Sequence, residues 1–115
     1  ALIEDIYTRG LDKDVTVLVW GEFGRTPKIN KDAGRDHWSR VGHALIAGGG
    51  LKMGQVIGST DSTGATVKDE PIPYPNILAT AYHAMGIDPH SMVNDISDRP
   101  NPVLPISTDV IAKLV

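Results

Sequence analysis

The sequence predicts an α/β fold, and three segments carry this prediction. Residues 15–20 (VTVLVW) form an apolar run rich in β-branched side chains, which is typical of a strand. Residues 2–9 and 75–85 place apolar residues at helical spacing. A strand that is apolar on both faces is typical of a parallel sheet with helices on each side. A helix, a glycine, a short turn and a buried strand together make half of a βαβ repeat.

The first helix and strand are bounded by local signals. Leu2, Ile3, Ile6 and Tyr7 share one face of the predicted helix 2–9. Gly10 stands where a helix end favours a left-handed residue, and the turn at 12–14 leads into the strand 15–20. We therefore expect the helix to end at Gly10 and the strand to be buried on both faces.

The rest of the chain alternates short apolar segments with turns. Further strands are predicted at residues 43–47 and 53–59, and a turn is predicted at residues 60–64. We expect the strand 43–47 to lie in the same sheet as the strand 15–20. Pro75 suits the first turn of the helix 75–85, and Gly86 ends it. We expect this helix to bury Ile77, Leu78, Ala81, Tyr82 and Met85. Residues 87–105 are expected to be irregular. Ser107 is expected to cap a last helix that has Asp109 in its first turn and contains Val110, Ile111, Leu114 and Val115.

Composition narrows the classes of function. The 115 residues suffice for one small domain, and the net charge of −3 gives no basic field for nucleic acid. The sequence has no apolar run long enough to span a membrane. With no cysteine, a metal site would have to use His, Asp or Glu. The 12 glycines and 8 prolines predict a loop-rich chain with a thin core, so we expect residues 1–115 to be a single domain cut from a larger one.

The candidate site is the loop of residues 21–40, which follows the strand 15–20. In an open α/β sheet, ligands bind beyond the carboxyl ends of the strands. Glu22, Asp36 and His37 are side chains that bind Zn²⁺, Mn²⁺, Mg²⁺ or Ca²⁺. Arg25 and Arg35 offer forked donors that match phosphate or sulfate. The sequence therefore predicts a divalent-metal and oxyanion site here.

Structural roles for the same residues stay open alternatives. Asp36 and His37 suit a hydrogen-bonded loop brace, and Glu22 suits an ion pair with either arginine. Phe23 and Trp38 suit anchors for the loop. The glycines 48–50 resemble a phosphate loop only superficially, because no Gly-Lys-Ser/Thr ending follows them, so close backbone packing is the preferred interpretation.

Four stretches resemble the C-terminal part of the DUF1501 family: GEFGRTP (21–27), GRDHW (34–38), HALIAGGGLKMGQVIGSTD (43–61) and PIPYPNILATAYHAMGIDP (71–89). That family in turn resembles the alkaline phosphatase and sulfatase superfamily. The resemblance implies part of a three-layer αβα sandwich and a two-metal site for phosphate or sulfate esters. It also suggests a bacterial protein that is exported or periplasmic.

The resemblance implies two kinds of function. The parent protein would be a metal-dependent hydrolase, with Glu22, Asp36 and His37 on the metal and Arg25 or Arg35 on the ester oxygens. The nucleophile would lie outside this chain, which would then be inactive alone. Alternatively, Phe23 stands where the superfamily has a metal ligand, which suggests a binding or scaffold domain without chemistry.

The expected partners follow from the same two readings. A small-molecule or polysaccharide ester is the expected substrate, with neither nucleic acid nor a membrane span involved. An unpaired strand edge and uncovered apolar faces predict a homo-oligomer, or association with a missing N-terminal part, that covers residues 15–20.

Overall fold

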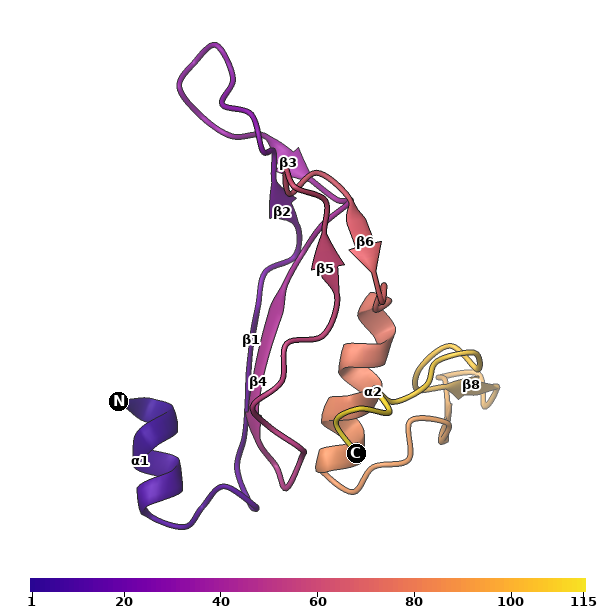
Figure 1. The fold of residues 1–115 in the computed structure, drawn as a ribbon. Coiled ribbons are helices and arrows are strands. Elements are labelled where there is room, and N and C mark those ends of the chain that lie inside the picture. The colour runs from indigo at the N-terminus through magenta and orange to yellow at the C-terminus, as the bar shows by residue number, and fades with distance from the viewer. The chain divides into compact units, whose positions relative to one another are not determined.

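The computed structural model describes residues 1–115, which fold into a mixed α/β structure of two helices and short strands (Figure 1). The chain divides into two compact units. Unit 1 contains residues 1–17, 47–54 and 72–115, and unit 2 contains residues 18–46 and 55–71. None of the helices is long and apolar enough to span a membrane.

Unit 1 begins with helix α1 (Leu2–Thr8). Gly10 adopts a φ of 68°, and its N–H donates to the Tyr7 carbonyl at 3.1 Å. The N–H of Leu11 donates to the Ile6 carbonyl at 2.9 Å, which completes a glycine-terminated helix end. The predicted stop at Gly10 is thus confirmed. Of the predicted apolar face, however, only Ile6 is buried.

Strands β1 (Thr16–Trp20) and β4 (Ala44–Gly48) pair in one two-stranded sheet, which confirms that the two predicted strands belong together. The expectation that residues 15–20 are buried on both faces is wrong, because β1 is only half-buried and Val19 is 58% exposed. The expected parallel sheet is not seen in the other three ladders, each of which is an antiparallel pair. An αβα sandwich therefore remains a proposal.

The glycines that end β4 bring two backbone segments of unit 1 together. The N–H of Gly49 donates to the Val15 carbonyl at 3.0 Å, and the N–H of Gly50 donates to the Asp12 carbonyl at 3.2 Å. Gly48 has a φ of 79°, and a Cβ there would overlap the carbonyl oxygen of Val15. Close backbone packing, the preferred interpretation of these glycines, is what the structure shows.

Helix α2 (Tyr74–Ala84) has Pro75 in its first turn and ends at Gly86, as predicted. Its buried face differs from the predicted stripe. Ala79 and Thr80 are fully buried, whereas Met85 is 57% exposed. The Thr80 hydroxyl donates to the Asn76 carbonyl at 2.7 Å and accepts the Ile111 N–H at 2.9 Å. Because these bonds satisfy the hydroxyl, a polar residue can occupy the centre of the packed face.

The predicted last helix after Ser107 is wrong, since residues 108–115 consist of a turn and irregular backbone. The Ile111 N–H bonds to the Thr80 hydroxyl, and the Leu114 carbonyl accepts the Lys52 N–H at 2.8 Å. The first of these bonds takes the N–H that a helix capped by Ser107 would donate to the Ser107 carbonyl. The buried apolar side chains all belong to unit 1: Ile6, Ala47, Ala79, Leu104 and Leu114.

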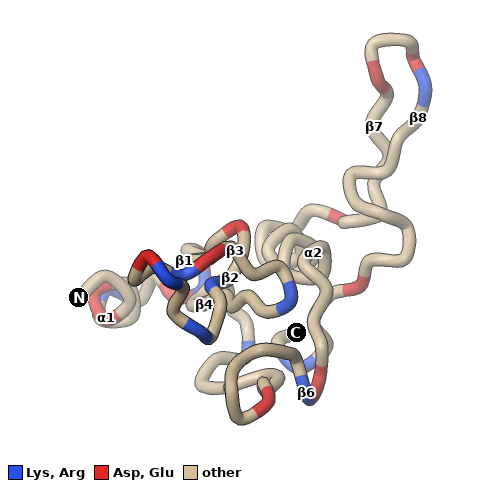
Figure 2. Tube along the Cα trace, turned by 90° about the horizontal axis from the view of Figure 1, so that it is seen from above, with Lys and Arg blue, Asp and Glu red and all other residues tan.

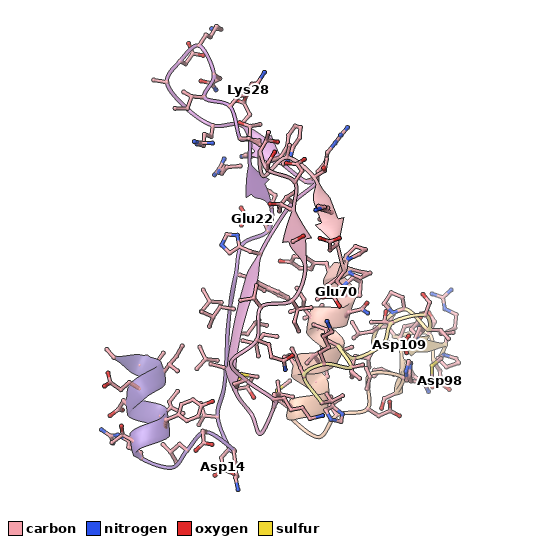
Figure 3. The ribbon with its side chains drawn as sticks, viewed as in Figure 1. Asp14, Glu22, Lys28, Glu70, Asp98 and Asp109 are labelled. Atoms are coloured by element: carbon pink, nitrogen blue, oxygen red, sulfur yellow. The ribbon has the colours of Figure 1, made fainter.

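A hairpin also forms where the sequence indicated irregular structure. Strands β7 (Met92–Asn94) and β8 (Pro100–Pro102) pair antiparallel. Figure 2 shows acidic and basic residues along the turn between them, and Figure 3 labels Asp98 there. The Asp95 carboxylate accepts the N–H groups of Ser97 and Arg99 and forms an ion pair with the Arg99 guanidinium. This one carboxylate closes the turn.

Unit 2 consists of two further hairpins. Strands β2 (Gly24–Arg25) and β3 (His37–Trp38) pair antiparallel, as do β5 (Ser59–Thr60) and β6 (Val67–Asp69). The predicted strand 53–59 is therefore wrong except at Ser59, while the predicted turn at 60–64 is confirmed. The Trp38 indole N–H donates to the Ala65 carbonyl at 2.7 Å and joins the two hairpins.

Replacing Gly48 tests the close approach at the end of β4. Gly48 and Gly54 both have a positive φ, 79° and 78°, but only Gly48 faces a neighbouring carbonyl. We expect Gly54→Ala to lower the free energy of unfolding by about 1–2 kcal/mol, the cost of the left-handed backbone alone. Gly48→Ala should cost about 3–5 kcal/mol, because the Val15 carbonyl must also move. Equal losses in urea denaturation would contradict the close approach.

Candidate functional site

All five predicted site residues lie on or beside the hairpin β2–β3. In the ladder, Arg25 is the partner of His37 and Gly24 is the partner of Trp38. Alternate residues of a strand share a face, so Phe23 and Arg25 point to the same side. Gly24 has no room for a side chain, since a Cβ would overlap the carbonyl oxygen of Val41. The ladder therefore sets an imidazole opposite a guanidinium.

Phe23 is the ring against which both groups lie. The ring centroids of Phe23 and His37 are 3.8 Å apart at an angle of 33°, and the Arg25 guanidinium carbon lies 5.3 Å from the Phe23 centroid. A guanidinium over an aromatic face is held by the ring quadrupole. Phe23 is half-buried, while Arg25 and His37 are exposed. The hairpin thus presents two hydrogen-bond donors side by side at its surface.

Arg35 has a different position from Arg25. Its Nη1 donates to the carbonyl oxygens of Thr26 and Pro27, at 2.6 and 2.7 Å. The guanidinium therefore closes the loop that leaves β2. The catalytic role predicted for Arg35 stays a prediction, but the contacts seen here are those of a structural residue.

Asp36 is also engaged inside the loop. Its carboxylate accepts the Asn30 side-chain amide at 2.8 Å, and its N–H donates to the Thr26 hydroxyl at 3.1 Å. The N–H of Thr26 donates to the Asp36 carbonyl at 3.0 Å. Asn30 Oδ1 in turn accepts the N–H groups of Asp32 and Gly34. This is the loop-brace arrangement that the sequence left open for Asp36.

The predicted metal ligands are not gathered in one place. Glu22 is exposed just after β1 (Figure 3), and the ion pair expected with Arg25 or Arg35 does not form. No three His, Asp or Glu side chains of the chain are close enough together to hold a metal ion. Glu22, Asp36 and His37 therefore do not make a complete metal site by themselves, and their assignment as ligands stays a prediction.

Trp38 and Asp61 hold the second hairpin of unit 2. Trp38 anchors the loop through its bond to Ala65, as predicted, and the Arg40 guanidinium carbon lies 5.5 Å from the Trp38 ring. The Asp61 carboxylate accepts both the N–H and the hydroxyl of Thr63 and of Thr66, and also the N–H of Ala65. The Thr66 and Thr63 hydroxyls, followed by the backbone amides, hold the pKa of Asp61 well below its usual range.

The sequence interpretation missed what Phe23 does. We expected an anchor that packs the loop onto the domain, whereas its ring contacts two of the predicted site residues. The alternation Phe23-x-Arg25 is a signal for this arrangement, because residues two apart share a strand face. The contact with His37 carries no such signal, since it depends on the register of the ladder.

The Asp61 network predicts a stability that depends on pH. Because the folded pKa of Asp61 is lowered, its contribution is present above the unfolded pKa of about 3.9 and is lost as pH falls below it. We expect the melting temperature of the wild type to drop between about pH 4 and pH 2 more than that of Asp61→Asn. Asp32→Asn removes an exposed carboxylate paired only with Lys31 and serves as the control. A wild type and Asp61→Asn with parallel pH profiles would contradict this role.

Arg35 predicts a local effect on the loop. Arg35→Met keeps the length of the side chain but removes both bonds to the Thr26 and Pro27 carbonyls. We expect the N–H groups of Thr26, Asn30 and Gly34 to exchange with solvent about 5-fold faster, which corresponds to about 1 kcal/mol. Arg40→Met is the matched control, because Arg40 contacts only the Trp38 ring. Unchanged exchange in Arg35→Met would mean that the guanidinium does not close the loop.

A known protein family matches this chain. No curated protein matches the sequence, and no solved structure matches it. One family, described as a protein of unknown function (DUF1501), matches residues 1–115. The match covers every element described above, including the hairpin β2–β3. The chain therefore belongs to the DUF1501 family.

Proposed function

We propose that this chain is part of a hydrolase for phosphate or sulfate esters, and that the hairpin β2–β3 holds the oxyanion. The observation that carries the proposal is the pairing of Arg25 with His37, both exposed and both against Phe23. A guanidinium fork matches two oxygens of a tetrahedral anion. Because the Phe23 ring already restricts the Arg25 side chain, that side chain loses less conformational entropy when it binds an anion.

The two side chains would have separate roles. Arg25 would hold two oxygens of the ester and stabilise the charge that develops on them during bond cleavage. His37 would donate a hydrogen bond to a third oxygen, or a proton to the leaving oxygen. Phe23 would position both without touching the reacting atoms.

A divalent metal enters this proposal only through the resemblance to the sulfatase superfamily. Glu22, Asp36 and His37 do not lie together as a ligand group, and the Asp36 carboxylate is bonded to Asn30. The donors of this chain therefore do not fit a metal site on their own, and we assign no step of the reaction to a metal ion.

The second candidate is a binding or scaffold domain that recognises an anion without cleaving it. The contacts of Arg35 and Asp36 favour this alternative, because both side chains hold the loop. The two candidates share the oxyanion contact at Arg25. They differ in whether bond cleavage follows.

Anion binding tests the shared part of the proposal. We expect inorganic phosphate and sulfate to shift the NMR signals of the hairpin β2–β3, and Arg25→Gln to weaken both affinities about 5–10-fold through loss of a charged hydrogen bond.

Arg40→Gln is the matched control for Arg25→Gln. Arg40 is also exposed and also lies over an aromatic ring of this hairpin, but that ring is Trp38, not Phe23. Equal affinities in wild type and Arg25→Gln, or equal losses in both arginine variants, would reject the site. Release of 4-nitrophenol from its sulfate or phosphate ester by the natural protein that contains this chain, lost in Arg25→Gln, would favour the hydrolase; binding without release would favour the second candidate.

A further inference from the structure

The segment 21–40, which contains the hairpin β2–β3, has a charge opposite to that of the rest of the chain. Its cations are Arg25, Lys28, Lys31, Arg35 and Arg40, and its anions are Glu22, Asp32 and Asp36. Five cations against three anions give the segment a net charge of +2 when His37 is neutral. The remaining residues contain six cations and eleven anions, which is a net charge of −5. Anions are therefore attracted to this segment and repelled by the rest of the chain.

Two of the five cations already have partners inside the segment. Lys31 Nζ lies 3.2 Å from the Asp32 carboxylate, and Arg35 donates to two backbone carbonyls. The Asp36 carboxylate accepts the side-chain amide of Asn30. These groups hold the loop, so the cations that a ligand can use are the other three.

Arg25, Lys28 and Arg40 are exposed, and their side chains form no ion pair or hydrogen bond within the chain. Arg25 and Arg40 each lie over an aromatic ring, and Lys28 lies on the loop beyond the ladder (Figure 3). Glu22 is the one carboxylate of the segment without such a partner. Three uncommitted cations thus stand against a single uncommitted anion.

Lys28 and Arg40 are both close to the Arg25–His37 pair along the chain. Lys28 follows Arg25 by three residues, and Arg40 follows His37 by three residues. Three residues of fully extended chain span about 10–11 Å at most, so each of these cations lies within that Cα distance of one member of the pair. A single small anion on Arg25 would leave both without a counter-charge, whereas a ligand with several anions would contact them together.

We propose, on the basis of the function proposed above, that the substrate carries several oxyanion esters on one chain. The ester to be cleaved lies on Arg25, and neighbouring esters of the same substrate contact Lys28 and Arg40. The chemical class is an oligosaccharide with pendant sulfate or phosphate esters. Nucleic acid is disfavoured, because its binding needs a longer basic surface and open aromatic faces for its bases, and the Phe23 and Trp38 rings already contact side chains of the segment.

Binding of methyl sulfate and of a sulfated maltohexaose to the chain tests this proposal. Affinities from NMR titration are compared per sulfate group, because a ligand with many sulfates binds more often by number alone. We expect the hexasaccharide to bind about 4–25-fold more tightly per sulfate, a gain of about 2–5-fold for each additional exposed cation. A gain in this pair, or in the matching pair of methyl phosphate and phosphorylated maltohexaose, supports the proposal and identifies the ester. No gain in either pair overturns it.

Two variants show which residues make the additional contacts. Lys28→Gln and Arg40→Gln should each lower the affinity for the hexasaccharide about 2–5-fold and change that for the methyl ester less. Each should also make the slope of log affinity against log salt shallower by about 0.7. Lys13→Gln is the matched control, because Lys13 is an exposed lysine of unit 1 and its loss changes the net charge equally. Equal losses in Lys13→Gln, or binding of a thymidylate hexanucleotide that is as tight and depends on the same two residues, would overturn the proposal.

The same titrations separate this inference from the proposed function. Methyl ester binding that requires Arg25, without any gain for the hexasaccharide, would reject this inference alone. No binding of any ester, or binding independent of Arg25, would reject the proposed function as well.

Discussion

The close approach of backbone segments at two glycines is the constraint on which both units depend. At Gly48, a side chain would overlap the carbonyl of Val15, next to the point where Gly49 donates its N–H to the same group. At Gly24, a side chain would overlap the carbonyl of Val41. The first approach ties the end of β4 to the start of β1 in unit 1. The second sets the path of β2 and, with it, the position of Arg25.

The polar residues that follow β1 divide into two groups with different roles. Arg35, Asp36 and Asn30 form hydrogen bonds within the loop, so their chemistry serves its shape. Arg25 and His37 contact an aromatic ring and remain exposed. A loop with no hydrophobic core of its own needs such side-chain bonds to hold one conformation. The hydrogen bonds of Arg35, Asp36 and Asn30 thus hold the loop in one conformation, which fixes the positions of Arg25 and His37.

Local signals explain which parts of the fold and site were predictable. The ends of α1 and α2 are marked by Gly10, Pro75 and Gly86, whose backbone preferences act within one turn. The last helix failed because a distant hydroxyl, that of Thr80, takes the Ile111 N–H. In the site, the residue types suggested anion chemistry, which stays a prediction, but they did not indicate that Arg35, and not Arg25, bonds to backbone carbonyls. That distinction depends on backbone carbonyls, which carry no sequence signal.

Ionised carboxylates replace core packing at the turns of both units. Asp61 in unit 2 and Asp95 in unit 1 each accept backbone N–H groups from the residues that follow. Bonds from the backbone and side chain of Arg99 also hold the pKa of Asp95 below its usual range. Only a few side chains of this chain are fully buried, so hydrophobic burial contributes little at these turns. The shapes of the hairpins β5–β6 and β7–β8 therefore depend on carboxylates that remain ionised. Trp38 joins the first of these hairpins to the candidate site.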